Sequence, residues 1–104
     1  MKKSIMLASL ILAVPGGTAQ AVDIQAGKEK ASTICASCHG INGISATDGF
    51  PNLAGQKAGY LTNALKAYRE GSRKAPIMNN MAANLSDHDI ENLAAHFSGL
   101  KPTP

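Results

Sequence analysis

Apolar residues recur at helical spacing in three stretches of the chain, at about residues 23–35, 59–70 and 86–98. Side chains three or four positions apart lie on one face of an α-helix, so each stretch predicts an amphipathic helix with one buried face. The apolar positions are Ile24, Gly27, Ala31 and Ile34 in the first stretch, Leu61, Ala64, Leu65 and Tyr68 in the second, and Ile90, Leu93, Ala94 and Phe97 in the third. Because no segment alternates apolar and polar residues as a half-buried strand does, the pattern predicts an all-α fold.

The third stretch carries signals for both of its ends. Ser86 is followed three residues later by Asp89, a pair that resembles a capping box at a helix N-terminus. Gly99 follows the last apolar position, where glycine commonly ends a helix. We therefore expect a helix that begins after Ser86 and stops at Gly99.

Two long segments separate the predicted helices, at roughly residues 40–58 and 71–85. Both contain Gly, Pro and Asn residues, which favour turns, so both are expected to be loops. Loops of this length without structure of their own are uncommon in a small domain. Their presence is understandable if they wrap around a large group that completes the interior.

The first 21 residues have the anatomy of a secretory leader. Lys2 and Lys3 precede an apolar run at residues 5–14, and Ala19-Gln20-Ala21 forms a small-residue cleavage signal. The apolar run is shorter than the roughly 20 residues that span a bilayer. We expect cleavage after Ala21 and export to the periplasm, which leaves residues 22–104 as one small domain.

Composition narrows the classes of function. Loss of Lys2 and Lys3 with the leader lowers the formal net charge from +3 to +1. The mature chain has few aromatic residues and no stacking platform with basic flanks, so it is not expected to bind nucleic acid. It also lacks an apolar run long enough to span a membrane, which predicts a soluble protein, expected to be a monomer. A chain this short often needs a metal, disulfides or a cofactor to stabilise its core.

The segment CASCHG, residues 35–40, contains both cysteines of the chain. A disulfide would suit an exported protein, but a redox-active C-x-x-C expects a βαβ setting that this all-helical pattern lacks. A zinc site needs about four ligands, and Cys35, Cys38 and His39 supply at most three. C-x-x-C-H is the attachment signature of c-type haem, so the favoured interpretation is one covalently bound haem c.

The spacing suits haem chemistry. Each thiol can add to one haem vinyl group, so that two thioether bonds hold the porphyrin and His39 lies close enough to bind the iron. The second axial ligand is expected in PIMNNM, residues 76–81, where either Met78 or Met81 could serve and either could instead be an ordinary core methionine. A thioether opposite an imidazole raises the reduction potential and fills both axial positions. Such iron is suited to outer-sphere electron transfer.

Several segments together resemble the small monohaem class I c-type cytochromes of bacterial periplasms. The matching pieces are AGKEKASTICASCHGINGIS, FPNLAGQKAGYL and MNNMAANLSDHDIENLAAHFS, which cover nearly the whole mature chain. The resemblance implies a class I cytochrome c fold, with three main helices and long loops around one haem. It also implies that the first and third helices cross near Gly27 and Phe97.

The resemblance also implies roles for individual residues. Cys35 and Cys38 hold the haem, and His39 is the proximal ligand. Pro51 corresponds to the proline whose carbonyl accepts a hydrogen bond from the ligand histidine. Met78 stands seven residues before Leu85, the position that the ligand methionine occupies in relatives, which leaves Met81 as a packing residue beside the haem.

Two further histidines lie in the third predicted helix. His96 stands where relatives tend to have tyrosine, and it lies off the apolar stripe, so a surface or edge position is expected. His88 falls in the first turn and is expected to be solvated. Neither is expected to bind iron while Met78 does.

The sequence thus predicts an electron carrier, and not an enzyme, that exchanges electrons with transient redox partner proteins in a respiratory chain. Two alternatives remain open: a haem subunit of a larger oxidoreductase, and a ligand-binding or peroxidase-like haem protein. A cluster of basic residues in the middle of the chain suggests a basic rim beside the haem edge that steers acidic partners, although such runs of charge are more often ordinary solvated surface. Its members are Lys57, Lys66, Arg69, Arg73 and Lys74, and the acidic Asp87, Asp89 and Glu91 gather at the third helix.

Overall fold

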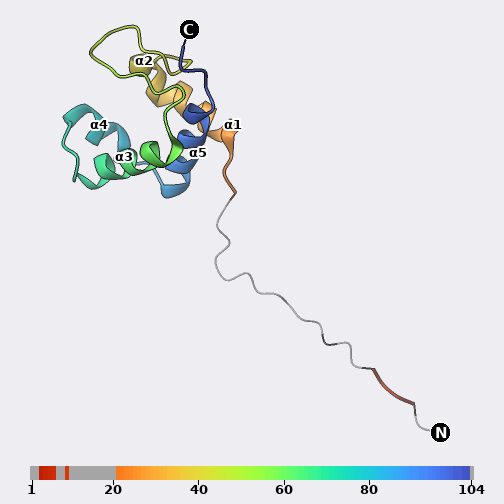
Figure 1. Cartoon of the computed structure of the whole chain (residues 1–104). Coiled ribbons are helices and arrows are strands. Elements are labelled where there is room, and N and C mark those ends of the chain that lie inside the picture. The colour runs from red at the N-terminus through yellow and green to blue at the C-terminus, as the bar shows by residue number, and fades with distance from the viewer. Residues whose placement is uncertain (1–2, 7–8, 10–20, 104) are drawn as a thin grey trace.

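The computed structural model describes residues 3–6, 9 and 21–103. Its helical segments are α1 (Ile24–Lys30), η1 (Ala31–Cys35), α2 (Ala36–His39), α3 (Ala58–Glu70), α4 (Pro76–Ala82) and α5 (Asp87–Ser98) (Figure 1). No strand occurs among the described residues, and the predicted all-α fold is confirmed. The leader predicted over residues 1–21 lies largely outside the described residues, and its cleavage stays a prediction.

The first predicted helix is longer than expected and contains a π-helical turn. It continues through η1 and α2 to His39, four residues beyond the predicted end. Within η1 the amide of Ala36 bonds the carbonyl of Ala31, five residues back instead of four. The hydroxyls of Ser32 and Thr33 donate to carbonyls one turn earlier, at 2.8 and 2.9 Å. π-Helical turns are rare and often occur next to functional sites. This one directly precedes α2, which carries Cys38 and His39.

Helices α1 and α5 pack against each other (Figure 1). Their backbones come close together at Gly27. A Cβ at Gly27 would lie 2.1 Å from the carbonyl oxygen of Asn92 and 3.2 Å from the Cβ of His96. The side chain of Asn92, which is buried, accepts a hydrogen bond of 2.8 Å from the amide of Asp23, the N-cap of α1. The crossing point implied by the family resemblance is therefore occupied by Asn92 and His96, next to Phe97.

Helix α5 supplies half of the residues of the buried hydrophobic core cluster. Its predicted apolar stripe is buried, and the capping box between Ser86 and Asp89 is present in both directions. The buried core cluster comprises Ala31, Leu61, Ala82, Leu85, Ile90, Leu93, Ala94 and Phe97. The stripe of the first helix is only partly correct, because Ile24 is 60% exposed while Gly27 and Ala31 are buried.

The sequence pattern predicts a loop over the second long segment, residues 71–85, and this prediction is wrong. It contains α4, which begins at Pro76 and ends at Ala82. Proline suits the first position of a helix because its ring fixes φ and its missing N–H would have no partner there. The pattern did not reveal α4 because seven residues are too few for a clear apolar period. The first long segment, residues 40–57, contains no helix, as predicted.

The two histidines of α5 do not lie where the sequence suggested. His96 is buried against α1, so the expected surface position is wrong. The cause is Gly27, whose missing side chain leaves room for the histidine at the crossing. His88 is half-buried and its Nε2 lies 3.2 Å from the carbonyl oxygen of Ala21, so it is less solvated than expected.

Basic and acidic residues that are separate in the sequence meet in the structure. Arg69 near the end of α3 donates to the carbonyl of Leu85 at 3.0 Å and pairs with Asp87 at 2.8 Å. This guanidinium lowers the pKa of Asp87, because the carboxylate is stabilised by the hydrogen bond and the charge. In the described part of the chain, no helix is long and apolar enough to cross a membrane.

Candidate functional site

The two cysteines and the histidine of the motif lie within one continuous helical stretch. Cys35 closes η1, while Cys38 and His39 belong to α2. Both cysteines are free and half-buried. Burial raises the pKa of the Cys35 thiol to about 11, so the thiol is protonated near neutral pH. The two thiols thus lie three residues apart in one helical stretch, and Cys38 directly precedes the buried His39.

The ring of His39 is held by a backbone carbonyl. Its Nδ1 lies 2.8 Å from the carbonyl oxygen of Pro51, and the residue is only 6% exposed. A carbonyl oxygen can only accept, so Nδ1 carries the proton and donates it. The neutral ring then has its lone pair on Nε2, which is the nitrogen available to bind a metal. The edge of the ring also packs against Phe50, with the ring centroids 6.2 Å apart.

The loop after α2 is folded so that the carbonyl of Pro51 returns to His39. Gly40 and Gly43 both have positive φ, and a Cβ at Gly40 would meet the backbone of Ile44 at 2.0 Å. The carbonyl of Gly43 accepts two hydrogen bonds, from the amides of Leu53 and Ala54. These contacts bring the chain on both sides of Pro51 back toward α2.

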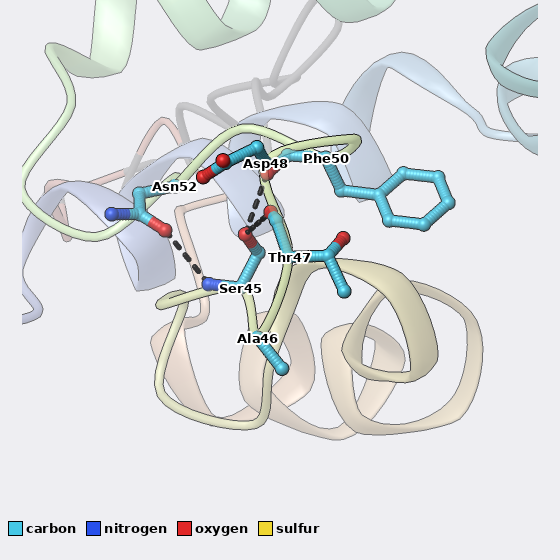
Figure 2. A pocket seen from close by; sticks show the side chains of 6 residues that line it. All are labelled: Ser45, Ala46, Thr47, Asp48, Phe50 and Asn52. Atoms are coloured by element: carbon cyan, nitrogen blue, oxygen red, sulfur yellow. Dashed lines mark hydrogen bonds between the residues drawn. The ribbon is translucent and has the colours of Figure 1, made fainter.

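Ser45 fastens the outer part of the same loop (Figure 2). Its amide donates to the side chain of Asn52 at 2.7 Å, and its hydroxyl lies within hydrogen-bond distance of the carbonyls of Thr47 and Phe50. A polar surface pocket is lined by Ser45, Ala46, Thr47, Asp48, Phe50 and Asn52 (Figure 2). Because Phe50 and Asn52 flank Pro51, this network holds the carbonyl that orients His39.

The two candidate methionine ligands both lie on α4. Met78 is half-buried, whereas Met81 is 42% exposed. They are three residues apart and share a helix face, so the backbone alone does not choose between them. The position of Met81 beside the haem, which the family resemblance implies, stays a prediction.

The residues of the site fit a c-type haem. Two free thiols stand at the right spacing, and one imidazole offers a single lone pair on Nε2. Half-buried side chains on the border of the core provide apolar surface, namely Ile34, Cys35, Leu53, Leu65, Tyr68 and Leu100. Within residues 3–6, 9 and 21–103, no three His, Cys, Asp or Glu side chains group together as a metal-ion site.

Sequence reasoning missed the residues that hold the loops. Ser45 and Asn52 carry no motif, and their contact across seven residues depends on the path of the loop. Asn79 on α4 and Asn92 on α5 were also not identified. The only sequence signal was a general one, because Asn and Ser often bond nearby backbone groups.

An all-helical domain with C-x-x-C-H at the end of its first helix, and with the histidine oriented by a carbonyl, defines a c-type cytochrome. The chain belongs to the cytochrome c family, whose profile matches residues 24–101. Cytochrome c-554(548) of Halomonas halodenitrificans is 47% identical over 73% of this chain and 94% of its own length. Cytochrome c4 of Azotobacter vinelandii is 38% identical over 99% of this chain and 53% of its own length.

Solved structures agree with the family assignment. The reduced recombinant cytochrome c4 from Pseudomonas stutzeri superposes with a TM-score of 0.66 and 34% identity, over 77% of this chain and 50% of that one. The chain therefore spans about half the length of its cytochrome c4 relatives and nearly all of cytochrome c-554(548). The fold is the class I cytochrome c fold, and the protein is an electron carrier that works through a c-type haem, not an enzyme.

Proposed function

We propose that this protein is a periplasmic carrier of single electrons, with one haem c attached to Cys35 and Cys38 and its iron bound by His39 and Met78. The observation that carries the proposal is the 2.8 Å hydrogen bond from His39 Nδ1 to the carbonyl of Pro51. It leaves the lone pair on Nε2 of this buried imidazole free to bind a metal, directly after the two thiols in the chain. A bound haem iron supplies the redox chemistry, since it accepts and releases one electron between Fe(III) and Fe(II).

The chain's own groups prepare this site in distinct ways. The two thiols attach the porphyrin at two points of one helical stretch. The carbonyl of Pro51 keeps the proton of His39 on Nδ1 and increases the donor strength of Nε2. The loop network around Ser45 holds that carbonyl in place.

Met78 is the second axial ligand in this proposal. Its offset from Leu85 matches the resemblance to class I cytochromes, and its half-buried position on α4 is compatible with a contact inside the domain. Met81 is the alternative on the same helix. With His39 and Met78 both bound to it, the iron would have no free site for a substrate or peroxide.

Location and partners complete the proposal. The leader pattern of residues 1–21 supports export, and cleavage after Ala21 would free the domain as a monomer. The relative from Stutzerimonas stutzeri named thiosulfate dehydrogenase electron acceptor, 39% identical over 94% of this chain, supports an exchange of electrons with other proteins. We propose that such partners bind transiently.

Mass spectrometry of the purified mature protein tests the covalent haem. The intact mass is expected to equal the chain from Val22 plus one haem, and acid-acetone should not extract the porphyrin. A mass that corresponds to the apoprotein with a disulfide, or to bound zinc, would contradict the proposal.

A pair of methionine variants tests the axial ligand. Met78→Ala should abolish the Fe(III)–thioether absorption near the red end of the spectrum, lower the reduction potential and open the iron to cyanide. Met81→Ala, the matched control on the same helix, should keep the absorption band. The reverse result would make Met81 the ligand.

A further inference from the structure

Asn79 directly follows Met78 in α4, and its side chain makes three hydrogen bonds. The Oδ1 atom accepts from the amide of Ala75 at 2.9 Å. The Nδ2 atom donates to the carbonyl of Tyr68 at 2.8 Å and to the carbonyl of Arg73 at 2.8 Å. Both N–H groups of this amide and its oxygen are therefore engaged with backbone atoms.

The acceptor side of Asn79 closes the first turn of α4. Ala75 is the residue before the helix, and it has no side chain able to cap the helix. The backbone amide of Asn79 bonds the carbonyl of Ala75 at 2.8 Å, while its side chain receives the amide of Ala75. Ala75 and Asn79 are thus joined in both directions, which defines where α4 begins.

The donor side of Asn79 fastens α4 to the end of α3. Tyr68 lies in the last turn of α3, and Arg73 lies in the connection between the two helices. Helix α3 packs against α5, and Tyr68 itself packs against the hydrophobic core cluster. A helix of seven residues is too short to be stable alone, and α4 depends on such contacts.

We propose that Asn79 is a positioning residue that holds α4 against α3 and thereby presents Met78, rather than Met81, to the haem iron. This inference rests on the proposed function, in which Met78 is the axial ligand. Without the three hydrogen bonds, α4 can shift or rotate relative to α3. The neighbouring sulfur, or none, would then face the iron for part of the time.

The test uses the holoprotein with covalently bound haem. Asn79→Asp has nearly the same shape and keeps the acceptor for Ala75, but it cannot donate to the carbonyls of Tyr68 and Arg73. Asn80→Asp is the matched control, because Asn80 lies on the same helix and is exposed. For each protein we would record the Fe(III)–thioether absorption band, the rate of cyanide binding to the ferric iron and the helix content by circular dichroism.

Asn79→Asp is expected to weaken the thioether band and to speed cyanide binding by about tenfold, a factor that the loss of one or two hydrogen bonds can produce. The control should match the wild type. Asn79→Gln retains an amide and is expected to recover part of the band, which guards against an Asp variant that does not fold.

If both Asn79 variants keep the wild-type band and cyanide rate, the positioning role is overturned although Met78 remains the ligand. If Met78→Ala keeps the band, it is instead the proposed ligation that fails.

Discussion

The chemistry of His39 depends on the position of one proton. The carbonyl of Pro51 can only accept a hydrogen bond, so it holds the proton on Nδ1 and leaves Nε2 free. The same contact prevents the ring from rotating, because the histidine is buried and Phe50 packs against it. One backbone atom thus sets both the tautomer and the orientation of the proposed proximal ligand.

His96 on α5 is a second buried histidine. Burial lowers its pKa, and the positive charge of Lys28 on α1 lowers it further. In the unfolded chain the pKa returns to about 6.5. The unfolded state therefore binds more protons at mildly acid pH, so this residue makes the protein less stable as the pH falls below about 6.5.

An NMR titration of the folded protein tests this prediction. The midpoint for the His96 ring should lie below about 6.5, the usual histidine value. Lys28→Gln should raise the midpoint by removing a neighbouring positive charge, whereas Lys57→Gln, in the residue just before α3, should leave it unchanged. A midpoint at or above 6.5 in the unmodified protein would show that burial does not control this ring.

Among the elements, the pair α1 and α5 depends most on a single residue. The crossing is close because Gly27 has no side chain, and the backbone carbonyl of Asn92 fills the space where a Cβ would stand. The carbonyl cannot move without disturbing α5, which also supplies the largest fully buried side chains, Ile90 and Leu93. Lys30 and Asp89 add an ion pair of 3.8 Å between the same helices, which contributes little because both side chains are partly exposed.

Gly27→Ala is predicted to lower the free energy of unfolding by about 1–3 kcal/mol or more, because the new Cβ overpacks a backbone contact. Gly59→Ala is the matched control: it lies in α3, and a Cβ there would meet nothing within 4 Å. That change should be neutral or stabilise the protein by up to about 1 kcal/mol, since alanine restricts the unfolded chain. Denaturant unfolding of both holoproteins measures the difference. Equal effects would mean that the crossing can relax around a methyl group.

At the scale of the whole molecule, an ion pair and hydrogen bonds within the domain reduce the basic surface that the sequence suggested. Arg69 is bound to Asp87 and to the carbonyl of Leu85, so it is not free to meet a partner. Arg73 donates to the hydroxyl of Tyr60 at 3.1 Å and lies over the ring of Tyr68 at 4.7 Å, yet it remains exposed and charged. Lys57 and Lys74 are also exposed.

The remaining basic residues predict a salt-dependent association with acidic redox partners. The association rate, measured by stopped-flow electron transfer, should fall as ionic strength rises, because salt screens charges beyond about 10 Å. A double variant, Lys57→Gln with Lys74→Gln, should reduce this dependence, and Lys28→Gln on α1 should change it less. A rate that stays constant between low and physiological ionic strength would exclude electrostatic steering.

The features that the sequence determined by itself are those made by neighbouring residues. The spacing of Cys35, Cys38 and His39 predicts haem attachment from the sequence alone, and all three residues lie in one helical stretch. Likewise, Ser86 and Asp89 cap α5 across three residues, and the apolar period of that helix predicts its buried face. These signals are local, so they can be recognised without knowledge of the fold.

The tertiary structure decided what depends on distant partners. The proton on His39 is set by Pro51, 12 residues away, and Asn92 caps the amide of Asp23 across 69 residues. His96 is buried at the crossing where Gly27, on another helix, has no side chain. Helix α4 is too short to be recognised from the period of its apolar residues, and contacts with α3 hold it in place. Burial and hydrogen-bond partners follow from how the helices pack, and a pattern that spans a few residues cannot carry that information.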